Sequence, residues 1–284
     1  MEIAFTKMHG LGNDFVVIDA ITQSISLSTA QIKFIANRNF GVGCDQILLV
    51  EKSDVADADF RYRIFNADGR EVEQCGNGAR CFATFVRDQG LTDKAEIPVI
   101  TSNGRIVLKI EDDNQEQGMV TVDMGAPLIT PAEIPFICDE QANSYTLDID
   151  VNGEHQNISF STLSMGNPHV VILVDNTEKA AVEDLGKAFQ TDSHFPNSVN
   201  VGFMQILDRQ NIRLRVYERS VGETQACGSG ACAAVVAGIN LGLLDETVEA
   251  QLLGGNLSIH WAGNQNPVMM TGPTATVFKG SIKL

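Results

Sequence analysis

The sequence predicts an α+β fold of two pseudo-symmetric domains, each a mostly antiparallel β-sheet or barrel wrapped around a central buried helix. Three observations predict this class. A long block of sequence recurs in the second half of the chain, which indicates a duplicated unit. Segments with strand-like patterns are joined by short turns, which favours antiparallel pairing. Residues 231–239 are apolar on every side, and a helix without a polar face belongs in an interior.

The duplication is clearest around two glycine-rich segments. EVEQCGNGARCFA, which ends at Ala83, aligns with ETQACGSGACAA, which ends at Ala234, and this places Cys75 on Cys227 at a shift of 152 positions. RYRIF at 61–65 falls on RLRVY at the same shift. Two more blocks recur in order: GNDFVVI on GNPHVVI at a shift of 154, and VGCDQIL on VGFMQIL at a shift of 159.

The first half has recognisable element boundaries. Ser28 or Thr29 can cap a helix that runs to about Asn37, with Ile32, Phe34 and Ile35 as its core residues. A second helix is expected over 79–89, and strands over 46–50, 60–65, 97–101, 105–110 and 120–124, with Asn103-Gly104 as a hairpin turn.

The second half repeats this plan. Strands are expected at 159–163, 170–174 and 212–217, followed by the helix from Ala231 and by hairpin-like segments near 252–261, 268–271 and 276–284. Proline and small residues at 125–135 suggest a linker. The expected domains are therefore 1–125, carrying Cys75 and completed by the last strand at about 274–284, and 126–273, carrying Cys227.

Composition limits the function classes. The 284 residues include 20 Lys and Arg against 36 Asp and Glu, a formal charge of −16 without a basic cluster. Nucleic acid and anionic membranes are therefore not expected as partners. No secretion signal is recognised and no apolar run is long enough to span a bilayer. We expect a cytoplasmic protein.

The cysteines are expected to be reduced thiols, because no secretion signal accompanies them. Neither half has a C-x-x-C pair and the histidines are scattered, so no metal site is expected. Cys81 and Cys232 are interpreted as buried residues of their helices, whereas Cys44 and Cys138 are assigned no role.

Cys75 and Cys227 differ from the other cysteines because a helix is expected to begin just after each. The first turn of a helix leaves N–H groups unpaired and carries partial positive charge, which stabilises a thiolate or a carboxylate. The pKa of a cysteine is lowered at such a position, so we expect a useful thiolate fraction near neutral pH. Two such thiols facing one another across a cleft between the halves could invert an amino-acid α-carbon, one removing its proton and the other returning one.

Six segments together resemble the motifs of diaminopimelate epimerases: MHGLGNDFVV, FNADG, QCGNGARC, SMGNPH, YER and GETQACGSGACAA. The resemblance runs from residue 1 to the final strand. It implies an isomerase that interconverts LL-2,6-diaminopimelate and meso-diaminopimelate without pyridoxal phosphate or another cofactor. It also implies a cytoplasmic homodimer that supplies lysine and peptidoglycan precursors.

By this resemblance Cys75 and Cys227 are the catalytic bases. The implied substrate-binding residues are Asn13, Gln46, Asn66, Gly76, Asn77, Asn167, Asn200, Glu218, Arg219, Gly228 and Ser229. An arginine can fork onto the carboxylate at the distal end of the substrate and a glutamate can pair with its ammonium. His169 is interpreted as a satisfied hydrogen-bonding residue. Where the family often has glycine and alanine after YER, this chain has Ser220 and Val221, and a positive φ at 220 would be costly for serine.

Three other functions are compatible with parts of the pattern. A related two-thiol racemase of the proline or hydroxyproline type shares the paired cysteines, but its substrate has no distal charged end for Glu218 and Arg219. Cys227 with His169 could act as a nucleophile and base in acyl transfer, which leaves Cys75 unexplained. A binding module with inert thiols would be distinguished by slow alkylation that substrate does not prevent.

Overall fold

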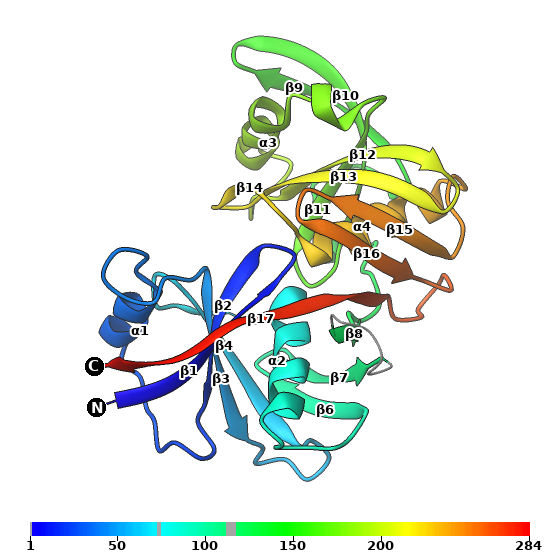
Figure 1. Cartoon of the computed structure of the whole chain (residues 1–284). Helices are drawn as coiled ribbons and strands as arrows, with labels where there is room; N and C mark the ends of the chain where they lie inside the picture. Colours follow the sequence, from blue (N-terminus) through cyan, green and yellow to red (C-terminus); the bar gives the residue numbers. More distant parts are fainter. Residues whose placement is uncertain (1, 73–74, 112–117) are drawn as a thin grey trace. The chain divides into compact units, whose positions relative to one another are not determined.

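A computed structural model describes residues 2–72, 75–111 and 118–284 of the chain (Figure 1). They form two compact units, Met1–Asp123 with Thr271–Leu284, and Met124–Met270. Glu73 and Gln74, which belong to the first glycine-rich motif, lie outside the described residues. Within the described ranges, no helix is both long and apolar enough to cross a membrane.

The first unit alternates short strands with two helices. Its elements are β1 (Glu2–Gly10), β2 (Asn13–Asp19), α1 (Thr29–Ala36), β3 (Gln46–Lys52), β4 (Phe60–Asn66), β5 (Glu71–Val72), α2 (Gly76–Asp88), β6 (Glu96–Thr101), β7 (Gly104–Ile110) and β8 (Gly118–Asp123). The long final strand, β17 (Met269–Lys283), begins in the second unit and continues through the first.

The strand pairings of the first unit form a closed ring. β1 pairs with both β17 and β2, the ring continues through β3, β4, β6, β7 and β8, and β8 pairs again with β17. The pairs β2–β3 and β4–β6 are parallel, and the other pairs with a described register are antiparallel. The helix α2 contacts strands on several sides of this ring and is buried over most of its length (Figure 1).

The second unit begins with a short 3-10 turn and a hairpin. Its elements are η1 (Pro131–Glu133), β9 (Tyr145–Val151), β10 (Glu154–Ser164), β11 (Pro168–Leu173), η2 (Thr177–Lys179), α3 (Val182–Thr191), β12 (Asn200–Asp208), β13 (Asn211–Glu218), β14 (Gly222–Thr224), α4 (Gly228–Asn240), β15 (Thr247–Leu252) and β16 (Gly255–His260).

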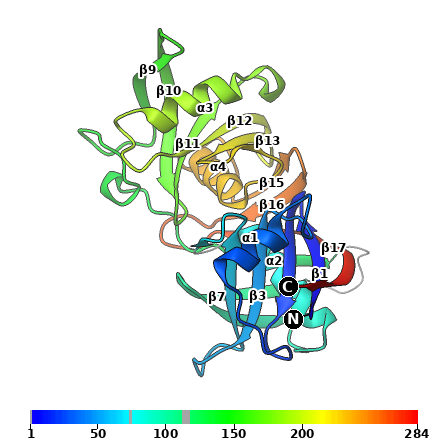
Figure 2. The same ribbon diagram turned by 90° about the vertical axis from the view of Figure 1, so that its left-hand side faces the viewer.

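The second unit repeats the pairing scheme of the first. The series β10–β11–β12–β13–β15–β16 corresponds to β1–β2–β3–β4–β6–β7, and its parallel pairs, β11–β12 and β13–β15, fall at the equivalent places. The helix α4 contacts strands of this series and is almost entirely buried, and Figure 2 shows it among β11, β12, β13 and β15. The expected α+β fold, with strands around a central buried helix, is confirmed.

Strand register corrects one part of the sequence alignment. Gln46 lies opposite Asn66 in the antiparallel pair β3–β4 and beside Phe15 in the parallel pair β2–β3. The equivalent position in the second unit is Asn200, which lies beside His169. The shift is therefore 154 positions, as for the neighbouring GNDFVVI block. The alignment of VGCDQIL with VGFMQIL at a shift of 159 is wrong, because Val42 precedes its strand whereas Val201 lies inside β12.

An outer helix packs on the strands of each unit. α1 has the expected cap: Ser28 and Gln31 form a capping box, and Ile32 and Ile35 are buried. Phe34 was expected in the core, but it is 41% exposed because it points away from that face. The sequence did not predict α3, since Gly186 interrupts its helical pattern. This glycine is required by packing, because a Cβ there would lie 2.4 Å from Cγ of Tyr217.

Several boundaries differ from expectation. α2 and α4 begin at the glycine directly after each cysteine, as expected, which is three residues before the ranges 79–89 and from Ala231. The two segments expected at 268–271 and 276–284 are parts of one strand, β17, which spans Met269–Lys283. The strands β9 and β12 were not predicted. The expected linker is bonded into the second unit, where Val268 N–H donates to the carbonyl of Gly125 and Leu128 pairs with Ser164.

The turn between β13 and β14 has a strained backbone at Ser220. This residue has φ of +65°, and Gly222 in the same turn has φ of +97°. Left-handed conformations are unfavourable for residues with a Cβ atom and accessible to glycine. The departure from the family pattern at this position therefore has an energetic cost.

We predict that Ser220→Gly raises the free energy of unfolding by about 0.5–1 kcal/mol, because relief of the left-handed strain exceeds the added chain entropy of glycine. Urea titration with linear extrapolation measures the change. Ser144→Gly, at an exposed position without positive φ, is the matched control and should lower stability or leave it unchanged. An equal response of both variants would contradict the assignment of strain.

A second prediction concerns the packing of α2. A Cβ at Gly78 would lie 2.6 Å from the hydroxyl oxygen of Tyr62 and 3.2 Å from the Phe15 ring. Gly78→Ala should therefore destabilise the protein by about 1–3 kcal/mol through overpacking, although alanine is the better helix former. Asp88→Ala, at the exposed end of the same helix, should change stability by less than about 0.5 kcal/mol in the same titration.

Candidate active site

The first candidate base lies at the start of α2. Cys75 is the N-cap residue, with an extended backbone (φ −139°, ψ 116°), and is half-buried, while Gly76 and Asn77 form the first buried positions of the helix. The Sγ atom lies 3.6 Å from Oδ1 of Asn13. The hydroxyl of Tyr62 donates to the Cys75 carbonyl at 3.3 Å. The thiol thus lies beside helix N–H groups that have no intrahelical partner.

The second candidate base occupies the equivalent position at the start of α4. Cys227 is the N-cap residue (φ −109°, ψ 106°), and Gly228 and Ser229 follow in the first turn. Its Sγ atom lies 3.7 Å from the hydroxyl of Ser229. Cys227 is more enclosed than Cys75, with 4% of its surface exposed.

The electrostatics of Cys227 differ from the sequence expectation. Burial raises the pKa of its thiol well above the ordinary value, and the nearby Glu218 carboxylate raises it further. Hydrogen bonds from Ser229 and from the Gly230 backbone act in the opposite direction. The expected lowering of the pKa by the helix start is therefore outweighed, and the thiol form of Cys227 is favoured.

The polar residues of the first unit gather at one edge of its barrel. Asn13 begins β2, Gln46 begins the parallel neighbour β3, and Asn66 ends the antiparallel β4, so their ends coincide. Nε2 of Gln46 donates to Oδ1 of Asn66 at 2.9 Å. Nδ2 of Asn77 donates to Oδ1 of Asn13 at 3.3 Å. This edge therefore presents amide groups that can both donate and accept.

The second unit gathers the equivalent residues at the equivalent edge. Nδ2 of Asn200 donates to the Pro168 carbonyl at 3.1 Å, and its Oδ1 accepts the Arg219 backbone N–H at 2.8 Å. Thr224 donates to Oε1 of Glu218 at 2.5 Å. Nη1 of the exposed Arg219 donates to the Asn197 carbonyl at 2.8 Å. The Glu218 carboxylate thus lies near Cys227, and the Arg219 backbone lies beside the amide of Asn200.

His169 links two of the predicted residues. Its Nε2 lies 3.0 Å from Oδ1 of Asn167 and 3.1 Å from the hydroxyl of Ser229. The buried Nδ1 has no hydrogen-bond partner among the described residues, so the expectation of a fully satisfied histidine is wrong for this atom. Burial and then the Arg219 charge lower the pKa of His169 to about 3, which keeps the imidazole neutral. Because Nε2 faces Ser229 rather than Cys227, the nucleophile–base pair required for acyl transfer is not formed.

The other cysteines lie outside these two edges. Cys81 and Cys232 are fully buried in α2 and α4, as expected, and burial raises the pKa of Cys81 to about 12. Cys44 is also buried, and burial raises its pKa to about 12. Within the described ranges, no group of three or more His, Cys, Asp or Glu side chains is arranged to hold a metal ion.

Sequence reasoning missed two charged residues beside the first site. Arg80 lies inside α2 with no exposed surface, and its Nη2 donates to Oδ1 of Asn77 at 3.0 Å. Asp45, directly before β3, accepts from Nδ2 of Asn13 at 3.0 Å. Arg80 had a signal in the sequence, since a charged residue within an otherwise apolar helix requires a partner. Asp45 had none, because an acidic residue before a strand is ordinary loop composition.

Comparison with known proteins gives a consistent result. The family model described as diaminopimelate epimerase matches residues 5–130 and 161–277. The diaminopimelate epimerase of Teredinibacter turnerae is 56% identical over 284 residues, covering all of both chains. That of Thioalkalivibrio sulfidiphilus is 58% identical over 286 residues, again covering all of both chains.

Solved structures show the same fold in more distant proteins. A phenazine biosynthesis protein of the PhzF family from Bacillus anthracis has a TM-score of 0.72 at 18% identity, with all of both chains covered. A hydroxyproline epimerase from Agrobacterium vitis has a TM-score of 0.70 at 14% identity, covering 99% of this chain and 92% of the other. These likenesses concern the fold alone. With a thiol at the start of each buried helix and full-length identity above half, the chain belongs to the diaminopimelate epimerase family.

Proposed function

We propose that this chain is a cofactor-independent two-base epimerase that interconverts LL-2,6-diaminopimelate and meso-diaminopimelate, with Cys75 and Cys227 as its acid–base groups. The observation that carries the proposal is the repetition of one arrangement: each unit has a cysteine at the N-cap of its enclosed helix. Membership of the family supports the reaction and the substrate.

The chemistry follows from the two N-cap positions. One thiolate removes the α-proton from one face of the carbon, and the thiol from the other unit returns a proton to the opposite face. The first-turn N–H groups at Gly76, Asn77, Gly228 and Ser229 bind the carboxylate at the reacting centre and stabilise its enediolate-like form. Each turnover exchanges the protonation states of the cysteines, so either can start as the acid. Burial raises the pKa of Cys227, which favours its thiol form.

The distal end of the substrate accounts for the remaining residues. We propose that Arg219 binds the distal carboxylate and Glu218 the distal ammonium, while Asn13, Gln46, Asn66, Asn167 and Asn200 donate and accept hydrogen bonds around them. A proline-type substrate has no such distal charges. The related proline or hydroxyproline racemase function therefore remains an outcome of the experiments, and distant likeness in fold does not favour it.

We further propose that the expected half-domains, 1–125 completed by 274–284 and 126–273, each contribute one cysteine to the reaction. The family suggests a cytoplasmic homodimer that acts in the biosynthesis of lysine and of peptidoglycan precursors. Sedimentation of the purified protein measures the oligomeric state directly.

Deuterium incorporation tests the reaction. In D2O without added cofactor, wild type should convert LL-diaminopimelate to the meso isomer with α-deuterium, observed by NMR. Cys75→Ala and Cys227→Ala should each lose epimerisation by roughly 10³-fold or more, since each removes a proton-transfer group. Cys138→Ala is the matched control, because its thiol contacts the Glu140 carbonyl and is outside both sites.

The outcomes separate the candidate functions. Activity on another amino acid but not on diaminopimelate would retain the two-base mechanism and reject the substrate. Full activity in either alanine variant would reject that cysteine as a base. Absence of exchange with every amino acid, together with slow alkylation of both thiols, would leave a binding module.

A substitution at Arg219 tests recognition of the distal carboxylate. Arg219→Lys keeps the charge but loses the planar fork, so KM for diaminopimelate should rise by about 10- to 100-fold with a smaller effect on kcat. The urea midpoint should not change, because Arg219 is exposed. Arg209→Lys, which alters an arginine paired with Asp245, should leave KM unchanged. Equal KM values for wild type and Arg219→Lys would remove Arg219 from the binding residues.

A further inference from the structure

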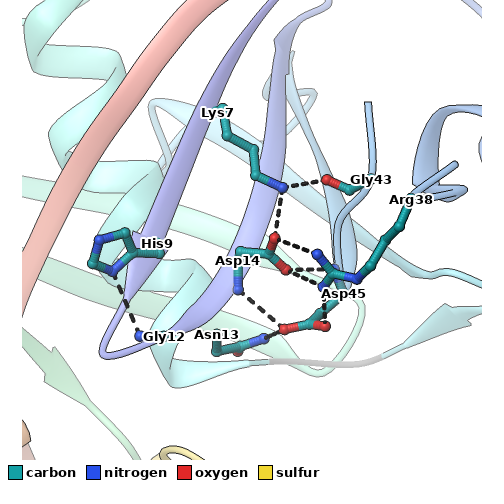
Figure 3. A network of polar contacts seen from close by, with 8 residues as sticks. All are labelled: Lys7, His9, Gly12, Asn13, Asp14, Arg38, Gly43 and Asp45. Atoms are coloured by element: carbon teal, nitrogen blue, oxygen red, sulfur yellow. Dashed lines mark hydrogen bonds and ion pairs between the residues drawn. The ribbon is translucent and has the colours of Figure 1, made fainter. Parts of the chain in front are cut away.

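The side-chain amide of Asn13 lies between a carboxylate and the Cys75 thiol. Its Nδ2 donates to Oδ2 of Asp45 at 3.0 Å, as drawn in Figure 3. Its Oδ1 accepts from Nδ2 of Asn77 at 3.3 Å and lies 3.6 Å from Sγ of Cys75. An amide has a donor end and an acceptor end, so its orientation decides which of the two faces the thiol.

The Asp45 side fixes the donor end. An ionised carboxylate only accepts hydrogen bonds, so the NH2 group of Asn13 must face it. Asp45 is itself held in place: Nη2 of Arg38 donates to its Oδ1 at 2.7 Å, and the backbone N–H of Asp14 donates to its Oδ2 at 3.1 Å. Arg38 also forks onto Asp14, which Lys7 contacts from the other side (Figure 3). The carboxylate that orients Asn13 is thus itself held in place by a network of ion pairs.

Arg80 fixes the acceptor end from inside the barrel. A guanidinium only donates, so the 3.0 Å contact from Nη2 of Arg80 requires oxygen at Oδ1 of Asn77 and turns the NH2 of Asn77 toward Asn13. Packing holds Arg80 close, because a Cβ at Gly10 would lie 3.1 Å from its Nη2. We call the series Asp45–Asn13–Asn77–Arg80 the relay. Each end of the relay is a charged group, and these two groups allow only one direction of hydrogen bonding along it.

We infer that Asp45 and Arg80 are positioning residues that fix the Asn13 amide so that its oxygen, not its nitrogen, faces the Cys75 thiol. An oxygen acceptor stabilises the S–H form and disfavours the thiolate. The relay therefore favours the thiol form of Cys75, and a substrate that engages Asn13 or Asn77 changes that preference. The inference rests on the proposed acid–base role of Cys75.

Several other titratable groups lie near the relay. Tyr62 on β4 and Cys81 on α2 are buried beside Cys75. Burial raises the pKa of the Tyr62 hydroxyl well above its ordinary value and raises that of the Cys81 thiol to about 12. Figure 3 draws the charged or titratable residues that form the network on β1, β2 and the segment between α1 and β3: Lys7, His9, Asp14, Arg38 and Asp45. The buried Cys44 thiol lies near Lys7, Asp14 and Asp45, and burial raises its pKa to about 12. The Asp14 carboxylate stays ionised because hydrogen bonds from Arg38 and Lys7 outweigh its burial and lower its pKa.

The rate of alkylation of Cys75 by iodoacetamide as a function of pH, followed by peptide mass spectrometry, tests the relay. Asp45→Ala frees the Asn13 amide to turn its NH2 group toward sulfur, so the pH midpoint at Cys75 should fall by about 0.5–1 unit. The midpoint at Cys227 in the same samples should not change. Asp59→Ala is the matched control, because it removes an ion-paired carboxylate of the same unit that bonds to Lys94.

A double-mutant cycle separates orientation from simple loss of charge. Removal of the Asp45 carboxylate also makes the local potential less negative, which alone lowers the midpoint. In an Asn13→Ala background, Asp45→Ala should therefore shift the midpoint by less than about 0.3 unit if the effect passes through the amide. An equal shift in both backgrounds, or no shift in Asp45→Ala itself, would overturn the inference.

Arg80→Lys examines the other end and keeps the buried charge. The lysine side chain is shorter and ends in a single ammonium group, so it cannot hold Asn77 in the same way. The Cys75 midpoint should therefore fall by less than in Asp45→Ala. The urea midpoint of the variant is measured alongside to verify folding. An unchanged Cys75 midpoint in folded Arg80→Lys would remove Arg80 from the relay. Alkylation does not require turnover, so a wild type without epimerase activity that still shows the shift would reject the proposed function and retain the relay. If wild type is an active epimerase but the Asp45→Ala variant shows no shift at Cys75, the proposed function is retained and the relay is rejected.

Discussion

The enclosure of a helix start dominates the chemistry of this protein. α2 and α4 begin in buried surroundings, so their first N–H groups are withdrawn from water while their partial positive charge remains. Such a position must be matched by an anion or by hydrogen-bond acceptors, and each unit places a cysteine there. The short polar side chains at the adjacent strand ends add further hydrogen-bond donors and acceptors beside each helix start.

Burial and the helix start act on a thiol in opposite directions, and the structure shows which effect prevails at Cys227. Enclosure and the Glu218 carboxylate raise its pKa more than the Ser229 and Gly230 hydrogen bonds lower it. Both causes disfavour a thiolate at this site. If Glu218 pairs with a substrate ammonium as proposed above, that pairing would weaken the second cause and so link substrate binding to the protonation of the sulfur.

The features that could be predicted from the sequence are those with a signal in a short stretch of neighbouring residues. The all-apolar face of α4 indicated an enclosed helix, and the repeated CGxGA segments located both helix starts. The Arg63–Glu71 and Arg215–Glu223 ion pairs, each bidentate, show that the repetition extends to side-chain contacts at the shift of 152 positions. α3 was missed because its central glycine serves a contact with Tyr217, which is distant in sequence and leaves no local signal. The relay through Asp45, Asn13 and Arg80 was missed because its contacts join residues that are distant in sequence, although Arg80 alone had a local signal.

The strand β17 has a consequence for the order in which the chain folds. It supplies the partner of β1 along nearly the whole length of that strand, and Phe5 packs edge-on against Phe278 at 5.9 Å between ring centroids. The N-terminal barrel is therefore incomplete until β17 has left the ribosome, whereas 124–270, which is synthesised earlier, contains its own strands and helices. During synthesis the second unit is in a position to fold first, and the exposed edges of β1 and β8 must stay unpaired until β17 emerges.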